Sequence, residues 1–211
     1  MDESKKTHWE QIYSSKAPNE VSWFQSTSRN SAELIEETGV KRVEQIIDVG
    51  GGASTLVDDL LDHGFKNISI LDISSTALEH SKHRLGDRAT LIEWLVYDIR
   101  TFRSTARFSV WHDRAVFHFL TDPLDRKAYM SVLNSALRPG GHVVIATFAI
   151  DGPQKCSGLE IVQYSTETLS REFGAEFELQ KSRTETHQTP WNSEQKFIYC
   201  VFKKTTGVVR G

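Results

Sequence analysis

Short apolar runs rich in β-branched residues alternate along the chain with stretches in which apolar residues recur at helical spacing. The runs that indicate buried strands are, in order, Ile46–Val49, Ile68–Leu71, Leu91–Val96, Phe108–Trp111 and Val143–Phe148. Helical spacing fills the intervals after them, with predicted helices beginning near Leu56, spanning Ala77–Leu85, and spanning Asp125–Leu137. Gly86 ends the second of these helices, and Pro139-Gly140-Gly141 ends the third. This alternation predicts right-handed crossovers and a parallel sheet covered on both faces.

The two ends of the chain depart from this alternation. After a predicted helix at Thr166–Phe173 come two strand-like stretches, Glu176–Arg183 and Lys196–Phe202. The connection between them is too short for a crossover helix with its loops, so we expect the two strands to pair antiparallel. At the other end, Trp9, Ile12 and Tyr13 share one helical face, and a second helix is expected at Ser31–Thr38, ended by Gly39.

Composition narrows the range of functions. The chain has 211 residues and a formal charge of −3, which argues against a nucleic-acid binder with a broad basic face. Two cysteines far apart in sequence exclude a disulfide framework and a Cys-rich zinc site, and no histidines pair at ligand spacing with a third ligand, so no metal site is predicted. The longest apolar run, Val143–Ile150, is too short to span a membrane, and the charged first thirty residues lack a signal-peptide pattern. We therefore expect a cytoplasmic protein.

A glycine-rich turn follows the first predicted strand, in the segment Asp48–Ser54. Asp72 closes the second strand and Asp98 follows the third, where carboxylates could accept hydrogen bonds from ribose hydroxyls and an adenine amino group. Together these features predict a bound nucleoside at the carboxyl edge of the sheet. A dinucleotide motif would have its third glycine where Thr55 stands, and Asp48 suits a cationic amino acid better than a pyrophosphate. A nicotinamide-binding dehydrogenase and a catalytically silent nucleoside-binding module are thus less favoured alternatives.

At this point the sequence resembles the class I S-adenosylmethionine-dependent methyltransferases. The motifs that carry the resemblance are Asp48–Ser54, Leu71–Ile73, Tyr97–Ile99, Trp111–Arg114 and Leu137–Gly141. The segment His8–Tyr13 is similar to the opening of small bacterial-type members, relatives of the thiol and lysine methyltransferases. The resemblance implies an α/β fold, a Rossmann-like, doubly wound, mostly parallel seven-stranded sheet with a C-terminal antiparallel strand pair. It also implies one domain over residues 1–211, with 1–44 as a helical cap over the cofactor and 45–211 as the core.

The implied cofactor is S-adenosyl-L-methionine, released as S-adenosyl-L-homocysteine. By the resemblance, an N-terminal aromatic segment closes over it. The implied cofactor-binding residues are Trp9, Tyr13, Trp23, Asp48, Gly50, Gly51, Gly52, Asp72, Ile73, Asp98 and Ile99.

The predicted activity is methyl transfer to a small-molecule nucleophile, a thiol, amine or oxygen. Because the fourth strand end faces the methyl group in this family, His112 and Asp113 are the candidate catalytic residues, with Arg114 and His118 behind them. A structural ion pair between Asp113 and Arg114 is the competing interpretation. The alternative function is protein lysine methylation, although that branch carries Asp-Lys-Gly where this chain has Asp113-Arg114-Ala115. We expect a monomer or weak homodimer that binds neither nucleic acid nor membrane.

Overall fold

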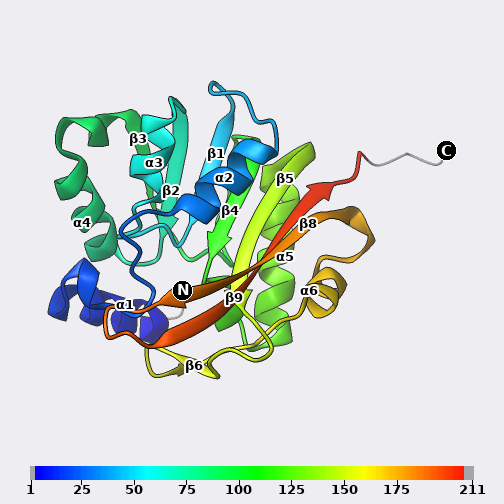
Figure 1. Ribbon diagram of the computed structural model, residues 1–211. Coiled ribbons are helices and arrows are strands. Elements are labelled where there is room, and N and C mark those ends of the chain that lie inside the picture. Colours follow the sequence, from blue (N-terminus) through cyan, green and yellow to red (C-terminus); the bar gives the residue numbers. More distant parts are fainter. Residues whose placement is uncertain (1–2, 207–211) are drawn as a thin grey trace.

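A seven-stranded sheet forms the centre of the protein, whose computed structural model describes residues 3–206 (Figure 1). The strand order is β3-β2-β1-β4-β5-β9-β8. The strands are β1 (Gln45–Val49), β2 (Asn67–Asp72), β3 (Ile92–Val96), β4 (Phe108–Arg114), β5 (Leu137–Phe148), β8 (Phe177–Gln188) and β9 (Glu194–Lys204). Strands β1 to β5 pair in parallel, and β9 runs antiparallel to both β5 and β8. The predicted fold class, including the C-terminal antiparallel pair, is confirmed.

Helices cover both faces of this sheet. They are α2 (Arg29–Glu37), α3 (Leu56–Asp62), α4 (Ser75–Leu85), α5 (Pro123–Ala136) and α6 (Thr166–Phe173), whereas α1 (Glu3–Ser15) packs against α4. Single 3₁₀ turns lie at η1 (Pro18–Glu20), η2 (Gly86–Leu91), η3 (Phe117–Phe119) and η4 (Gly174–Glu176), and a small hairpin at β6 (Lys155–Cys156) and β7 (Leu159–Glu160). Helices α2, α3 and α4 pack into one core cluster, and α5 and α6 into the other.

The two cores are separated by the alternation of side chains along each strand. Ile47 and Trp111 belong to the core under α5 and α6, whereas Ile46 and Val110 belong to the core under α2, α3 and α4. The same alternation governs the polar residues that follow them. Even-numbered residues at the ends of β1 and β4 therefore face α2, and odd-numbered residues face α5.

Several boundaries differ from the sequence prediction. The predicted helix 125–137 ends at Ala136, and β5 begins at once at Leu137, taking in the Pro-Gly-Gly stretch that was expected to be a loop. The register between β4 and β5 jumps there, from Phe108 opposite Leu137 to Val110 opposite His142. The stretch is thus a bulge, which lets a proline and two glycines remain inside a strand. The β8–β9 pair is also longer than predicted.

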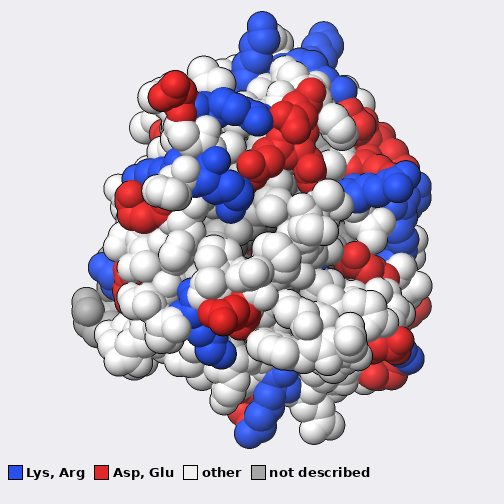
Figure 2. Space-filling view, turned by 60° about the vertical axis from the view of Figure 1, so that its left-hand side comes forward, with Lys and Arg blue, Asp and Glu red and all other residues white. Residues whose placement is uncertain are grey.

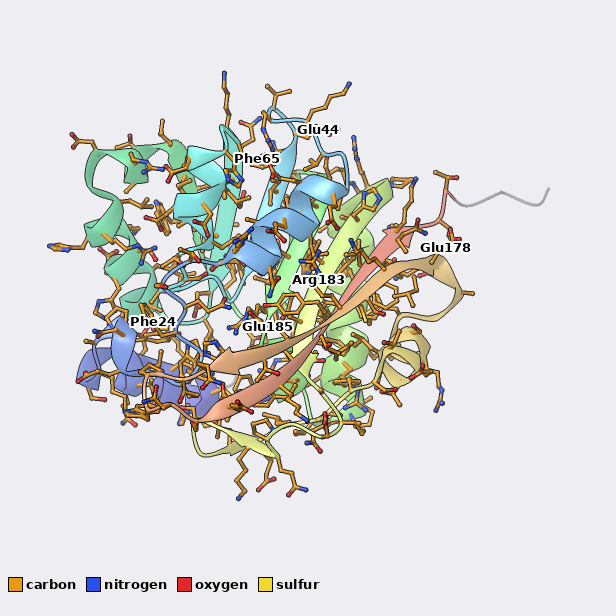
Figure 3. All side chains as sticks on the ribbon, viewed as in Figure 1. Phe24, Glu44, Phe65, Glu178, Arg183 and Glu185 are labelled. Atoms are coloured by element: carbon orange, nitrogen blue, oxygen red, sulfur yellow. The ribbon has the colours of Figure 1, made fainter. Side chains whose placement is uncertain are left out.

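The described helices are short, and the charges on the surface are mixed. None of the described helices is both long and apolar enough to cross a membrane. Figure 2, with the side of α1 and α4 turned forward, shows acidic and basic side chains interspersed around a broad uncharged area. On another face, Arg183 of β8 lies beneath α2 (Figure 3), where its guanidinium contacts Glu33 at 3.0 Å and Glu37 at 3.4 Å.

Candidate cofactor and acceptor site

Two adjoining cavities lie at the carboxyl ends of the central strands, the position where open α/β sheets hold their ligands. The larger is lined by Lys5, Trp9, Tyr13, Trp23, Val49, Gly50, Leu71, Asp72, Ile73, Tyr97, Asp98, Ile99, Arg100, Arg114, Ala115, Val116, Phe119, Leu120 and Cys156. The smaller is lined by Tyr13, Pro18, Val21, Trp23, Phe24, Gln25, Ser28, Asp48, Gly50, Gly51, Ala53, Ser54, Thr55, His112 and Arg114. Tyr13, Trp23, Gly50 and Arg114 belong to both, so the cavities adjoin along these side chains.

The glycine loop between β1 and α3 forms the floor between the cavities. Gly50 has φ +69°, a conformation that favours glycine, and a Cβ there would overlap Val116. A Cβ on Gly51 would overlap the Asp48 carboxylate, so the absence of a side chain lets the loop lie against that acid. Gly52 lines neither cavity. A Cβ on Gly52 would lie 2.6 Å from Asp72 Oδ2 and 2.8 Å from Ala77, so Gly52 permits close packing of the loop on α4.

Asp48, at the end of β1, lines the smaller cavity and is only 2% exposed. Its Oδ1 lies 2.6 Å from His112 Nδ1, and the other ring nitrogen of His112 lies 2.8 Å from Ser31 Oγ on α2. Its Oδ2 is buried and has no hydrogen-bond partner among the described residues. Because an unpaired buried carboxylate oxygen is costly, this atom marks a position suited to a donor from a ligand.

Asp72, at the end of β2, lines the larger cavity and is also buried. The backbone N–H of Ser74 donates to its Oδ1 at 2.8 Å. Burial, with the nearby negative charge of Asp48, raises the pKa of Asp72 to about 7 despite hydrogen bonds from the Ser74 and Gly52 backbone. Donors that favour the ionised carboxylate, such as ribose hydroxyls, would therefore bind here in competition with a proton.

Asp98, beyond β3, also lines the larger cavity, but its carboxylate is already engaged. Arg100 Nε donates to both of its oxygens, at 3.0 and 3.2 Å, and Arg100 also contacts Asp125 at 2.8 Å. Burial alone would raise the pKa of Asp98, and the hydrogen bonds from Arg100 hold it below its usual value. Lys5 of α1 reaches Asp125 at 3.1 Å, which ties the N-terminal helix to this end of the cavity. Ile73 and Ile99 add apolar lining nearby.

Helix α1 and the segment after it supply aromatic walls. The Trp9 ring centroid lies 5.7 Å from that of Trp23 and 5.1 Å from that of Phe119, with near-perpendicular planes in both pairs. Tyr13 is 7% exposed, and its carbonyl accepts a hydrogen bond from His80 Nε2 at 2.8 Å. All three predicted aromatic residues of the N-terminal segment, Trp9, Tyr13 and Trp23, thus line the larger cavity.

Glu10 fastens α1 onto the first turn of α4. Its carboxylate accepts from the backbone N–H groups of Ser75 at 2.8 Å and Thr76 at 3.1 Å, and from the hydroxyls of Ser74 and Ser75 at 2.9 Å. Burial alone would raise the pKa of Glu10, but hydrogen bonds from Thr76, Ser75 and Ser74 hold it at about 2. A carboxylate at a helix N-terminus also interacts favourably with the helix dipole. The sequence reasoning missed this residue, because its partners lie more than sixty positions away.

The two predicted catalytic residues point to opposite faces of β4, as strand alternation requires. His112 faces Asp48 and Ser31. Asp113 faces the α5 core, is fully buried and lines neither cavity: its Oδ1 accepts from the N–H of Val116 at 3.0 Å, and its Oδ2 accepts from the Tyr129 hydroxyl at 2.7 Å. The expectation that both residues line one reactive centre is corrected by this geometry. Asp113 instead holds the turn that follows β4.

His118, expected behind the reactive centre, is buried outside both cavities. Its Nδ1 accepts from the Phe148 N–H at 3.3 Å, and burial lowers its pKa to about 3, so the ring is neutral. Cys156 does line the larger cavity, but burial raises its pKa to about 12, so the thiol is not a nucleophile at neutral pH. His187 does not line the larger cavity; its Nε2 donates to the Ser22 carbonyl at 2.8 Å.

Arg114 is the charged residue at the junction of the two cavities. Its Nε donates to the Tyr199 hydroxyl at 3.0 Å and its Nη1 to the Trp23 carbonyl at 3.2 Å, while its guanidinium lies 4.3 Å from the Phe197 ring centroid. Its Nη2 has no hydrogen-bond partner among the described residues. On the outer side, Glu185 of β8 (Figure 3) accepts from Gln25 at 3.2 Å. These contacts hold the aromatic segment around Trp23 against the sheet.

Over residues 3–206, no group of three or more His, Cys, Asp or Glu side chains is arranged to hold a metal ion.

Comparisons with known proteins find methyltransferases among the relatives of this chain. Residues 47–143 match a family model described as a methyltransferase domain. The chain is 26% identical over 112 residues to malonyl-[acyl-carrier protein] O-methyltransferase 2 of Ilyobacter polytropus, covering 53% of this chain and 42% of that protein. The chain spans about half the length of the curated relatives it matches.

Solved structures share the fold over most of the chain. The N-methyltransferase NodS of Bradyrhizobium japonicum WM9, in complex with S-adenosyl-L-homocysteine, superposes with a TM-score of 0.70 at 16% identity, covering 92% of this chain and 97% of that one. A second solved structure comes from work on the conversion of a disulfide bond into a thioacetal group during echinomycin biosynthesis. It superposes with a TM-score of 0.77 at 16% identity, covering 95% of this chain and 93% of that one. At such identities the likeness establishes the fold.

Proposed function

We propose that this chain, which belongs to the class I S-adenosylmethionine-dependent methyltransferase family, transfers a methyl group from S-adenosylmethionine to a small-molecule nucleophile. The observation that carries the proposal is the Oδ2 atom of Asp48, which is buried beside the glycine loop and has no hydrogen-bond partner within residues 3–206. A carboxylate at this point fits a cationic amino group and would repel a pyrophosphate. The nicotinamide-dependent alternative is accordingly disfavoured.

The residues present fit S-adenosylmethionine along both cavities. Asp48 would hold the amino group in the smaller cavity, which Gly50 and Gly51 also line. Asp72 would accept from the ribose hydroxyls in the larger cavity. Asp98, Ile73 and Ile99 would enclose the adenine. The carboxylate of Asp98 accepts hydrogen bonds from Arg100, and its oxygens could accept a further one from the adenine amino group. When bound, the cofactor supplies a methyl group activated by a sulfonium.

The N-terminal segment up to residue 44 serves, in this proposal, as the cap of a single domain whose core begins at residue 45. Trp9, Tyr13 and Trp23 would exclude water and present flat aromatic faces to the ligand. Cation–π attraction to such faces also suits a sulfonium. Glu10 and Lys5 keep the cap in place through α4 and Asp125.

The acceptor would enter the end of the larger cavity that is walled by Trp9, Phe119, Cys156 and Arg114. The protein's contribution there is alignment, which can be worth about 7–11 kcal/mol in a two-reactant transfer. Because Asp72 and Asp98 would be occupied by the nucleoside, we propose that the acceptor reaches the site already deprotonated, without a protein base. Thiols and carboxylic acids meet that condition more readily than the protonated side chain of a lysine.

Two further proposals concern the protein's setting. We place it in the cytoplasm, as a monomer or weak homodimer without nucleic acid or membrane partners. The mixed charge of the visible face and the two unpaired, buried cysteines support this setting.

The test is a screen of thiols, phenols, carboxylic acids and amines with methyl-labelled S-adenosylmethionine, read by mass spectrometry of the products. The proposal expects label in at least one small-molecule product, in an amount that scales with the protein. Label found only on lysines of added proteins would support the lysine methyltransferase alternative instead.

A further inference from the structure

A chain of three buried polar side chains connects α2 to the glycine loop. Ser31 Oγ lies 2.8 Å from His112 Nε2, and His112 Nδ1 lies 2.6 Å from Asp48 Oδ1. Ser31 is 1% exposed, His112 3% and Asp48 2%. They come from three different elements, α2, β4 and β1, so the arrangement depends on the tertiary fold.

The order serine, histidine, carboxylate is that of the hydrolase triad, but access differs here. His112 and Asp48 line the smaller cavity, and Ser31 is not among its lining residues. A substrate in that cavity cannot reach the hydroxyl, which excludes nucleophilic attack by Ser31. The end of this hydrogen-bonded series that faces the cavity is the carboxylate of Asp48.

The hydrogen-bond directions follow from the chemistry of the groups. Asp48 accepts only, so the proton on the shared bond belongs to His112 Nδ1. With the ring neutral, Nε2 is an acceptor, and Ser31 donates its hydroxyl proton to it. The relay then ends on the carboxylate, whose Oδ1 is hydrogen-bonded and whose Oδ2 has no hydrogen-bond partner among residues 3–206.

We infer that His112 is a positioning residue for the cofactor's amino group, acting through Asp48. Resting on the proposed function, this inference assigns His112 to the cofactor side of the site instead of the acceptor side. Ser31 fixes the ring, the ring fixes the carboxylate, and Oδ2 is held where it can accept from a cationic amine. Without the ring, a buried carboxylate would have neither oxygen hydrogen-bonded, which disfavours its charged form.

The experiment compares two ligands and two substitutions by calorimetry. S-adenosylhomocysteine carries the amino group, whereas 5′-methylthioadenosine carries the same nucleoside thioether without the amino acid. His112→Phe removes both hydrogen bonds at similar volume. His112→Asn keeps a side-chain N–H near the position of Nδ1.

We expect His112→Phe to weaken S-adenosylhomocysteine binding by about tenfold to a hundredfold, the range of one charge-assisted hydrogen bond. Binding of 5′-methylthioadenosine should change by less than about threefold, and His112→Asn should recover most of the lost affinity. Equal losses for both ligands, or no loss for either, would overturn the inference. Should His112→Phe not fold, His112→Leu, which also removes both hydrogen bonds, is compared with the wild type using the same two ligands: a loss confined to S-adenosylhomocysteine supports the inference, and equal losses or no loss overturn it. Failure of either ligand to bind the wild-type protein would instead contradict the proposed function.

Discussion

At the scale of single residues, the site depends on which face of a strand each side chain occupies. The sequence placed His112 and Asp113 correctly at the end of the fourth strand, and it placed Asp48, Asp72 and Asp98 at three other strand ends. It could not show that His112 and Asp113, which are adjacent in sequence, have their side chains on opposite faces of the sheet. Asp113 finds Tyr129, and His112 finds Ser31, only after the chain has folded.

Asp113 should therefore be a stability residue. Asp113→Asn should lower the free energy of unfolding by about 1–3 kcal/mol, the cost of leaving buried donors without their acceptor. Affinity for S-adenosylhomocysteine should stay within about threefold. Urea denaturation beside calorimetry measures both, with the exposed Asp87→Asn as the control that should change neither. Unchanged stability combined with lost turnover would return Asp113 to the reacting centre.

Asp72 should make cofactor binding depend on pH. Its pKa of about 7 in the free protein means that a proton must leave before ribose hydroxyls can donate to both oxygens. Affinity for S-adenosylhomocysteine should therefore fall as the pH drops below about 7, by up to about tenfold per pH unit. Asp72→Asn should bind about tenfold more weakly at pH 8 and lose this dependence. Calorimetry between pH 5.5 and 8.5 tests both, and a flat wild-type profile would contradict the assignment.

For the helices and strands, the alternation of apolar runs with stretches at helical spacing was sufficient to predict each strand of the seven-stranded sheet, including the antiparallel pair at its end. The errors lie where polar residues sit inside an element. Strand β4 continues past Trp111 through three polar residues, because their partners come from distant parts of the chain. Strand β5 absorbs Pro139 and Gly140 as a bulge, which a local pattern of turn residues cannot distinguish from a loop.

Helix α1 is held against α4 by Glu10, so a substitution of Glu10 should loosen α1. Glu10→Gln removes the charge that accepts from the first turn of α4, so α1 should detach more often. We expect faster dissociation of S-adenosylhomocysteine by severalfold and faster proteolysis within the first twenty residues. Stopped-flow displacement and limited trypsin digestion measure these rates, with Glu79→Gln on the exposed side of α4 as the control.

The pH dependence of this docking has a definite sign. A pKa held at about 2 in the folded protein is below that of an unfolded glutamate, so the contribution is present above about pH 4.5 and is lost as the pH falls toward 2. Cap stability should thus be constant from pH 6 to 8. If the affinity for S-adenosylhomocysteine varies between pH 6 and 8 and still does so in Glu10→Gln, another group causes that variation, and Asp72 is the candidate.

At the scale of the whole molecule, the fold brings the ends of β1, β2, β3 and β4 to one edge and closes that edge with an N-terminal aromatic segment. Strand order and crossover handedness are general properties of parallel α/β sheets, which is why the position of the cavity could be predicted from sequence. The identity of the acceptor could not, since the residues that we propose face it, Trp9, Phe119, Cys156 and Arg114, are lining residues that no single motif connects.

The central claim is that these cavities bind an S-adenosyl ligand whose amino group pairs with Asp48. The most direct measurement is calorimetric titration of S-adenosylhomocysteine into the wild-type protein and into Asp48→Asn, with circular dichroism confirming that both are folded. We predict saturable one-to-one binding to the wild type and a loss of about tenfold or more in Asp48→Asn, because the charged partner of the amino group is removed. No binding to the folded wild type, or equal affinity in the two proteins, would contradict it.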